Sequence, residues 1–160
     1  MKPEIDEIDS KIICFLQKDG RMPYTKIAEE LGIVEATVRS RVQRLVRDEV
    51  IEIVAICDPV KLGFAMSGNI KLHVNTKEID QIVKELKAFA EITYIAVMIG
   101  DSNIDIDFIV RSLPDLHRLV YEKISSIEGI NKVETSIVSG YKKEVYDYGT
   151  CFNMKDSKEE

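Results

Sequence analysis

A short stretch of the chain carries arginine, glutamine and serine side chains at a spacing suited to hydrogen bonding with nucleic-acid bases. Residues 26–45 predict two short amphipathic helices that meet at Gly32, and the second helix is rich in arginine. An exposed helix face with these donors, and with a small alanine that allows close approach, is what reading of the DNA major groove requires. The side chains expected to contact DNA are Lys26, Glu35, Ala36, Thr37, Arg39, Ser40, Gln43, Arg44 and Arg47.

Three residues fix how the two predicted helices cross. Ala28 supplies a small side chain at the crossing, Gly32 tolerates the positive φ of the turn, and Val38 closes the crossing. The alternative is that the second helix is a solvated helix of an ordinary helical subdomain. The agreement of these positions with the basic outward face favours a helix-turn-helix. The apolar residues expected behind it are Ile27, Leu31, Ile33, Val42 and Leu45.

The composition fits a globular protein. The chain has 160 residues, 45% of them hydrophobic, which suffices for one domain or two small ones. No segment is apolar enough to span a bilayer and the first residues lack the pattern of a signal peptide, so we expect a cytoplasmic protein. The net charge of −6 argues against a DNA-packaging protein, which binds chiefly through positive charge. The net charge does not exclude DNA binding altogether, because binding depends more on the local electrostatic field over the docking surface than on the charge of the whole chain.

The elements before residue 64 follow from periodicity and turn residues. Apolar residues at helical spacing predict a first helix from about Glu4 to Lys18, with Gly20 as its stop. The run Val50–Ile56 is rich in β-branched residues and predicts a β linker beside a winged-helix-like domain. The turn residues Asp58-Pro59 and Gly63 predict a hinge between two domains.

The second half of the chain alternates between strand and helix patterns in the order βαββαβ. This order predicts a ferredoxin-like α+β domain, an antiparallel sheet with both helices on one face. The other face is expected to carry apolar residues (Ile95, Val97 and Ile109, or their alternates) and so to need a partner. The predicted strands are 66–74, 92–99, 104–110 and 130–138. The predicted organisation is a helix-turn-helix domain at 1–50, the linker at 51–64, the ferredoxin-like domain at 65–140, and a C-terminal strand and disordered tail at 141–160.

Nothing in the sequence predicts a cofactor or a metal. The cysteines are far apart, so Cys14 and Cys57 are expected to be small buried hydrophobes and Cys151 to lie in a mobile tail. The segment Asp101-x-Asn103-x-Asp105 imitates the beginning of a calcium loop, but the chain lacks the Gly and Glu that such a loop needs later. Its alternating apolar residues favour a strand instead.

The ordered set of motifs resembles the Lrp/AsnC (leucine-responsive, feast/famine) family of transcription regulators. The resemblance covers residues 5–140 and implies a homo-oligomeric, sequence-specific DNA-binding protein, assembled as dimers and as four dimers in a ring. Glu35, Ala36, Arg39, Ser40 and Gln43 would then face bases, while Lys26, Arg44 and Arg47 would hold phosphates. The motifs that carry it are Ile27-Ala28-Glu29-x-Leu31-Gly32, Glu35-Ala36-Thr37-Val38-x-x-Arg41-Val42-x-Arg44-Leu45, Asp58-Pro59-x-x-Leu62-Gly63 and Gly100-Asp101.

The resemblance also implies an amino-acid effector site where dimers meet, at Gly100, Asp101, Ser102 and Asn103. Backbone amides around Gly100 would receive a carboxylate, and Asp101 would pair with an ammonium group. Ser102 replaces the family's aromatic residue, so we expect a polar or basic amino acid rather than leucine. The alternative is that the loop is an ordinary hairpin turn.

Two further positions depart from the family. Val34 stands where a serine usually caps the second helix of the motif, and the missing cap should lower the stability of the domain by about 1 kcal/mol. The alternative is that Val34 is buried against the bundle and contributes stability there. Asp105 and Asp107 replace an apolar and a basic residue. They are expected on the open face of the sheet, paired with a lysine, His73 or a ligand, because an unpaired buried carboxylate is unfavourable.

The alternative function is a metabolite-binding ferredoxin-like module, or an enzyme or enzyme regulatory protein, without sequence-specific DNA binding. The sequence offers no nucleophile–base spacing, no paired histidines and no phosphate-cradling glycine loop, so we expect no catalytic activity.

Overall fold

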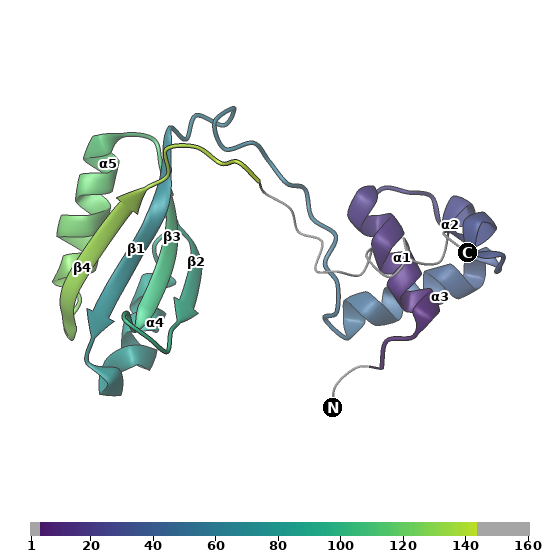
Figure 1. The fold of residues 1–160 in the computed structure, drawn as a ribbon, viewed down its shortest axis with the longest axis horizontal. Coiled ribbons are helices and arrows are strands. Elements are labelled where there is room, and N and C mark those ends of the chain that lie inside the picture. Colours follow the sequence, from purple (N-terminus) through teal and green to yellow (C-terminus); the bar gives the residue numbers. More distant parts are fainter. Residues whose placement is uncertain (1–3, 144–160) are drawn as a thin grey trace. The chain divides into compact units, whose positions relative to one another are not determined.

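The computed structural model describes residues 4–143, and the chain divides into two compact units (Figure 1). One unit includes the described residues up to Ile56 together with Lys143, and the other spans Cys57–Lys142. Within residues 4–143, no helix is both long enough and apolar enough to cross a membrane.

The described residues of the N-terminal unit form three helices: α1 (Glu7–Lys18), α2 (Tyr24–Leu31) and α3 (Glu35–Arg47). Helix α1 begins at Glu7 rather than Glu4 because Asp6 caps it, in a reciprocal capping box with Asp9. It ends at Asp19 in extended backbone, so Gly20 is not the left-handed stop that we expected. The core of this unit includes Ile12, Leu16, Ile27, Ala28, Val38 and Val42.

The prediction of a β linker after the helix-turn-helix is wrong in this structure. Residues 50–57 form no strand, and the side chains of Ile53, Val54 and Ile56 are exposed. The β-branched composition suits a strand, but a strand needs a neighbouring edge for its backbone hydrogen bonds. No such edge is present in the described part of the N-terminal unit, which therefore has a helix-turn-helix without a wing. The turn after it is present, with the Asp58 carboxylate accepting from the Val60 amide at 3.0 Å.

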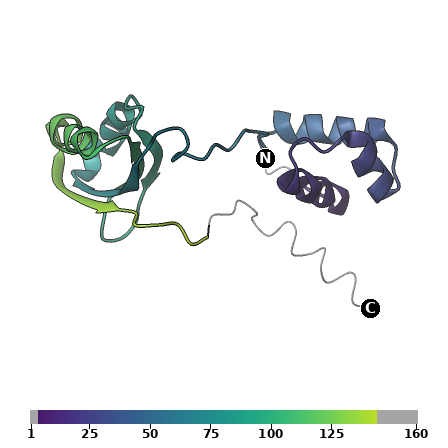
Figure 2. The same cartoon turned by 90° about the horizontal axis from the view of Figure 1, so that it is seen from above.

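The C-terminal unit confirms the βαββαβ order. Its strands are β1 (Met66–Val74), β2 (Ile92–Val97), β3 (Ile104–Val110) and β4 (Ile130–Ile137), in the antiparallel sheet order β2-β3-β1-β4. A short turn (Thr76–Glu78) leads into α4 (Ile79–Leu86). Helix α5 (Leu113–His117) is capped by Ser112 and continues through a π-helical segment (Arg118–Lys123) and a 3₁₀ turn (Ile124–Ser126). Both helices cover the same face of the sheet (Figure 2).

The open face of the sheet is polar, which corrects the apolar face that we predicted. Ile95 packs into the helix-covered core, and Val97 pairs with the buried Ile104 and so shares its side. A bulge between Ile92 and Tyr94 shifts the alternation of β2, so only Ile109 of the three named residues faces outward. The strand registers place on the open face Ser67, Asn69, Lys71, His73, Tyr94, Ala96, Asp105, Asp107, Ile109, Lys132, Glu134 and Ser136.

The predictions for the cysteines and the C-terminus had mixed outcomes. Cys14 is fully buried, as expected, whereas Cys57 is exposed because the segment around it joins no core. Residues 141–143 form no strand. Cys151 and the rest of the predicted tail lie outside the described residues.

Candidate nucleic-acid interface

The turn between α2 and α3 has the geometry that the sequence predicted. Gly32 adopts φ 66° and ψ 32°, the left-handed conformation in which a Cβ is unfavourable. The Ile33 amide donates to the Ala28 carbonyl at 3.0 Å, which closes the turn. Ala28 and Val38 are buried where the two helices cross. This packing fixes which side of α3 faces outward.

The outward side of α3 is exposed over its whole length. Its exposed side chains are Ala36, Arg39, Ser40, Gln43 and Arg47, and Lys26 of α2 is exposed as well. Glu35 and Thr37 are half-buried at the beginning of the helix. This surface, called the α3 face below, offers amide, hydroxyl and guanidinium groups to a partner while the small Ala36 leaves room for close approach.

Two arginines of the α3 face have acidic neighbours. Arg39 pairs with Glu35 one helical turn earlier, and its guanidinium lies 5.5 Å from the ring centroid of Tyr24. Arg47 pairs with Asp48 at 2.8 Å, a hydrogen bond that lowers the pKa of the Asp48 carboxyl. Both pairs are exposed, so a phosphate or a base can displace the acid at little energetic expense.

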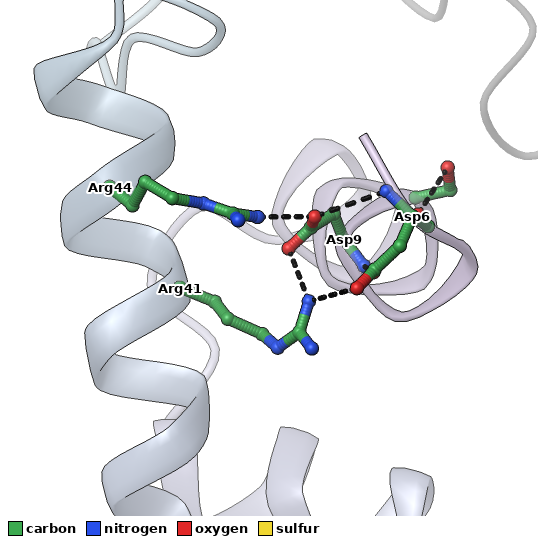
Figure 3. A network of polar contacts seen from close by, with 5 residues as sticks. Asp6, Asp9, Arg41 and Arg44 are labelled. Carbon is green, nitrogen blue, oxygen red and sulfur yellow. Dashed lines mark hydrogen bonds and ion pairs between the residues drawn. The ribbon is translucent and has the colours of Figure 1, made fainter. Parts of the chain in front are cut away.

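Arg44 does not point outward, which corrects its predicted orientation. It and Arg41 reach from α3 to Asp9 on α1 (Figure 3). Arg41 bridges two carboxylates, at 2.6 Å from Asp6 and 2.8 Å from Asp9, and Arg44 binds the other oxygen of Asp9. The amide of Asp9 and then Arg41 hold the pKa of the Asp6 carboxyl below its usual value. We call these four residues the Asp9 network.

The sequence contains a signal for the Asp9 network that periodicity alone misses. Asp9 falls within the apolar stripe of α1, one turn before Ile12 and one turn after Ile5, and its side chain is 0% exposed. A carboxylate in such a position requires a cationic partner. The partners lie more than thirty residues away, and nothing local identifies them.

The N-terminus of α3 lacks a side-chain cap. Val34 occupies the N-cap position, makes no capping hydrogen bond and is 68% exposed. Burial of Val34 against the bundle is therefore excluded as the reason for its presence. Relative to serine, the missing cap costs about 1 kcal/mol, partly offset by the acidic Glu35 in the first turn.

The predicted effector loop connects β2 and β3, and two of its three side chains, those of Ser102 and Asn103, point inward. Ser102 is buried and donates to Asp105. The side-chain oxygen of Asn103 accepts a hydrogen bond from the backbone amide of Val74 at 2.9 Å, which holds the loop against β1. Asp101 and Gly100 are exposed. The loop therefore presents Asp101 and backbone groups, and the polar side chains of Ser102 and Asn103 hold its shape.

Asp105 and Asp107, the two carboxylates after the loop, accept hydrogen bonds from side chains other than the lysine or His73 that we expected. Asp105 accepts from Ser102, and Asp107 accepts from the Asn69 amide at 3.1 Å. Among the residues that the structure describes, no group of three acidic, histidine or cysteine side chains is placed to hold a metal ion. Of the segment that imitates a calcium loop, Asp101 and Asn103 lie in the loop before β3, and the strand begins at Ile104, as the apolar alternation from Ile104 onward indicated.

A hollow of about 200 Å³ lies elsewhere in the C-terminal unit. Sequence reasoning did not identify it. The Arg111 guanidinium lies over the Phe64 ring there, 5.3 Å from its centroid. Its acidic side chains are already paired, Glu91 with Lys123 and Asp115 with Arg118. None of the four loop residues lines this hollow.

Comparison with known proteins covers both units. Residues 5–46 match the AsnC-type helix-turn-helix domain, and residues 64–148 match the Lrp/AsnC ligand binding domain. Over 143 residues the chain is 38% identical to an uncharacterized HTH-type transcriptional regulator of Pyrococcus horikoshii, covering 89% of this chain and 90% of that protein.

Two solved structures have the same fold. E. coli AsnC superimposes with a TM-score of 0.84 at 24% identity, covering 91% of this chain and 99% of that one. A feast or famine regulatory protein of M. tuberculosis, complexed with L-methionine, gives a TM-score of 0.81 at 21% identity, with coverage of 88% and 96%. The two domain matches and the Pyrococcus horikoshii relative favour the DNA-binding interpretation over a ferredoxin-like module without DNA binding.

Proposed function

Because this chain belongs to the Lrp/AsnC family of transcriptional regulators, we propose that it binds double-stranded DNA through α3 and responds to an amino acid through its C-terminal unit. The exposed α3 face carries the first half of the proposal. Glu35, Ala36, Arg39, Ser40 and Gln43 are assigned to bases, with Thr37 beside them. Lys26, Arg44 and Arg47 are assigned to backbone phosphates. The protein acts in the cytoplasm, within reach of the chromosome.

The protein acts as a homo-oligomer in this proposal. One α3 face offers few cations, and its acidic neighbours reduce the field further, so a single half-site provides little affinity. Two subunits joined through their C-terminal units double the contacts on one DNA molecule. The family resemblance favours dimers, and four dimers in a ring, as the form in which this happens.

Substitution of two arginines tests the docking assignment. Arg39→Ala should reduce the preference for the operator over random DNA by about 1–3 kcal/mol, the value of a good base contact. Arg47→Ala, at the helix end, should weaken binding to both DNAs by the same factor, because phosphate contacts carry no sequence information. The operator is first selected from random DNA with the wild-type protein, and both affinities are then measured at equal salt. An unchanged affinity ratio in both variants contradicts the assignment.

The effector is proposed to bind at the exposed part of the loop at residues 100–103. The exposed Asp101 carboxylate can pair with the ammonium group of an amino acid, and the neighbouring backbone N–H groups can donate to its carboxylate. The L-methionine complex of the M. tuberculosis relative supports an amino acid as the ligand class. Ser102 and Asn103 are assigned to shaping the loop, and the absence of an aromatic residue from residues 100–103 favours a polar or basic amino acid.

Thermal unfolding in the presence of each of the twenty amino acids tests this assignment. A bound amino acid should raise the midpoint by mass action, and Asp101→Ala should abolish the rise. Absence of any shift would leave the loop as a hairpin turn. A shift that persists in the variant would place the ligand at another site.

A further inference from the structure

Asp9 is a fully buried carboxylate with a complete set of donors. Its two oxygens receive Arg41 and Arg44 of α3 and the backbone amide of Asp6. Asp6 in turn accepts from the Asp9 amide and from Arg41. The carboxylate is thus fixed on α1 from one side and holds two side chains of α3 from the other (Figure 3).

Arg44 borders the α3 face, whereas Arg41 lies deeper against α1. Arg44 is one helical turn from both Ser40 and Arg47, which are exposed on the α3 face, and its side chain is 40% exposed. Arg41 is 23% exposed and is occupied by two carboxylates. One terminal nitrogen of Arg44 binds Asp9, and the planar guanidinium can donate to a second acceptor from its other edge.

We propose that Asp9 is a positioning residue for DNA docking, which holds the guanidinium of Arg44 at the edge of the α3 face where a backbone phosphate binds its remaining N–H groups. Asp9 itself is 0% exposed and acts only through Arg44. The inference rests on the proposed function. It explains how Arg44, which reaches toward α1, can still bind a backbone phosphate of DNA.

Loss of the Asp9 charge and loss of the Arg44 anchor change DNA affinity in opposite directions, so the sign of the change on substituting Asp9 tests the proposal. A carboxylate near the DNA repels phosphates, so its removal alone raises affinity. A freed Arg44 must lose its rotamer freedom on binding, so removal of the anchor lowers affinity. Asp9→Asn keeps the shape and removes the charge. We expect it to weaken binding about three- to tenfold, to operator and random DNA alike.

Glu7→Gln is the matched control for charge. Glu7 lies on the same helix, is exposed and pairs only with Lys11 among the interactions seen in residues 4–143. Its substitution removes one negative charge without disturbing the Asp9 network, so affinity should stay equal or rise slightly. An Asp9→Asn variant that binds as tightly as Glu7→Gln, or more tightly, overturns the proposal.

Repeating Asp9→Asn in an Arg44→Ala chain separates positioning from a general structural role. If Asp9 acts through Arg44, adding Asp9→Asn to the Arg44→Ala chain should leave its DNA affinity equal or slightly higher, because only the loss of the carboxylate charge then acts. A purely structural role lowers affinity in both backgrounds and overturns the proposal. Affinities are measured below the thermal midpoint of every variant. If wild-type protein shows no preference among sequences, the proposed function fails; if it does and Asp9→Asn binds normally, only the positioning role fails.

Arg44→Lys decides the question even if Asp9→Asn does not fold. Lysine keeps the charge and can bind either Asp9 or a phosphate, but it lacks the planar fork that binds both in fixed geometry. We expect it to lose most of the affinity that Arg44→Ala loses. Full affinity in Arg44→Lys overturns the proposal.

Discussion

A fragment of residues 1–57 should bind a two-half-site operator at least about 100-fold more weakly than the full chain. The fragment contains the complete α3 face but lacks the C-terminal unit, which we propose joins two subunits. Without that link the second half-site must be filled from solution rather than at the high effective concentration within a dimer. Titration of both proteins at equal salt measures the difference.

Fragment folding has to be controlled in this experiment, because a bundle of this size buries a small core and is marginally stable. The helical circular dichroism of the fragment reports whether it is folded. Fusing it to an unrelated dimeric coiled coil should recover most of the lost affinity. A monomeric, folded fragment that matches the full chain would refute the dimer argument.

Gly68→Ala should lower the free energy of unfolding of the C-terminal unit by about 3 kcal/mol. Gly68 lies on β1 between its partners Phe108 on β3 and Ile137 on β4. A Cβ at this position would lie 2.1 Å from the Ser136 carbonyl oxygen and 2.7 Å from the Phe108 ring. The backbone oxygen cannot move without breaking the β1–β4 ladder, and Phe108 is one of the largest buried side chains. Denaturant unfolding measures the loss.

Gly140→Ala is the matched control for the same substitution. A Cβ there would meet nothing within 4 Å, so its unfolding free energy should stay within about 0.5 kcal/mol of wild type. Equal midpoints for the two variants would show that β1 and β4 separate without penalty and would contradict the packing argument.

The sequence predicted well those features that depend on local chemistry. The turn at Gly32, the buried Ala28 and Val38, and the exposed residues of α3 all follow from helical periodicity and from the tolerance of glycine for positive φ. The four strands of the C-terminal unit follow from the switch between two periods, and their ends differ from the predicted ones by at most two residues.

Features that depend on distant partners could not be predicted. The residues paired in the Asp9 network are more than thirty positions apart, and no periodic pattern connects them. The β-branched run at 50–56 has strand propensity, but propensity does not supply the neighbouring edge. On β2, a bulge between Ile92 and Tyr94 reverses the alternation beyond it and places Ile95 and Val97 on the covered side of the sheet.

The run at residues 50–56, which is exposed from Glu52 onward, has a consequence for the solubility of the protein in a concentrated cell. Its sequence, β-branched and poor in charge, is of the kind that nucleates cross-β aggregation when the backbone is unpaired. Glu52 within the run and Asp58-Pro59 directly after it match the gatekeeper residues that interrupt such stacking. The charge and the proline at these three positions are thus suited to limiting aggregation, a role separate from DNA or effector binding.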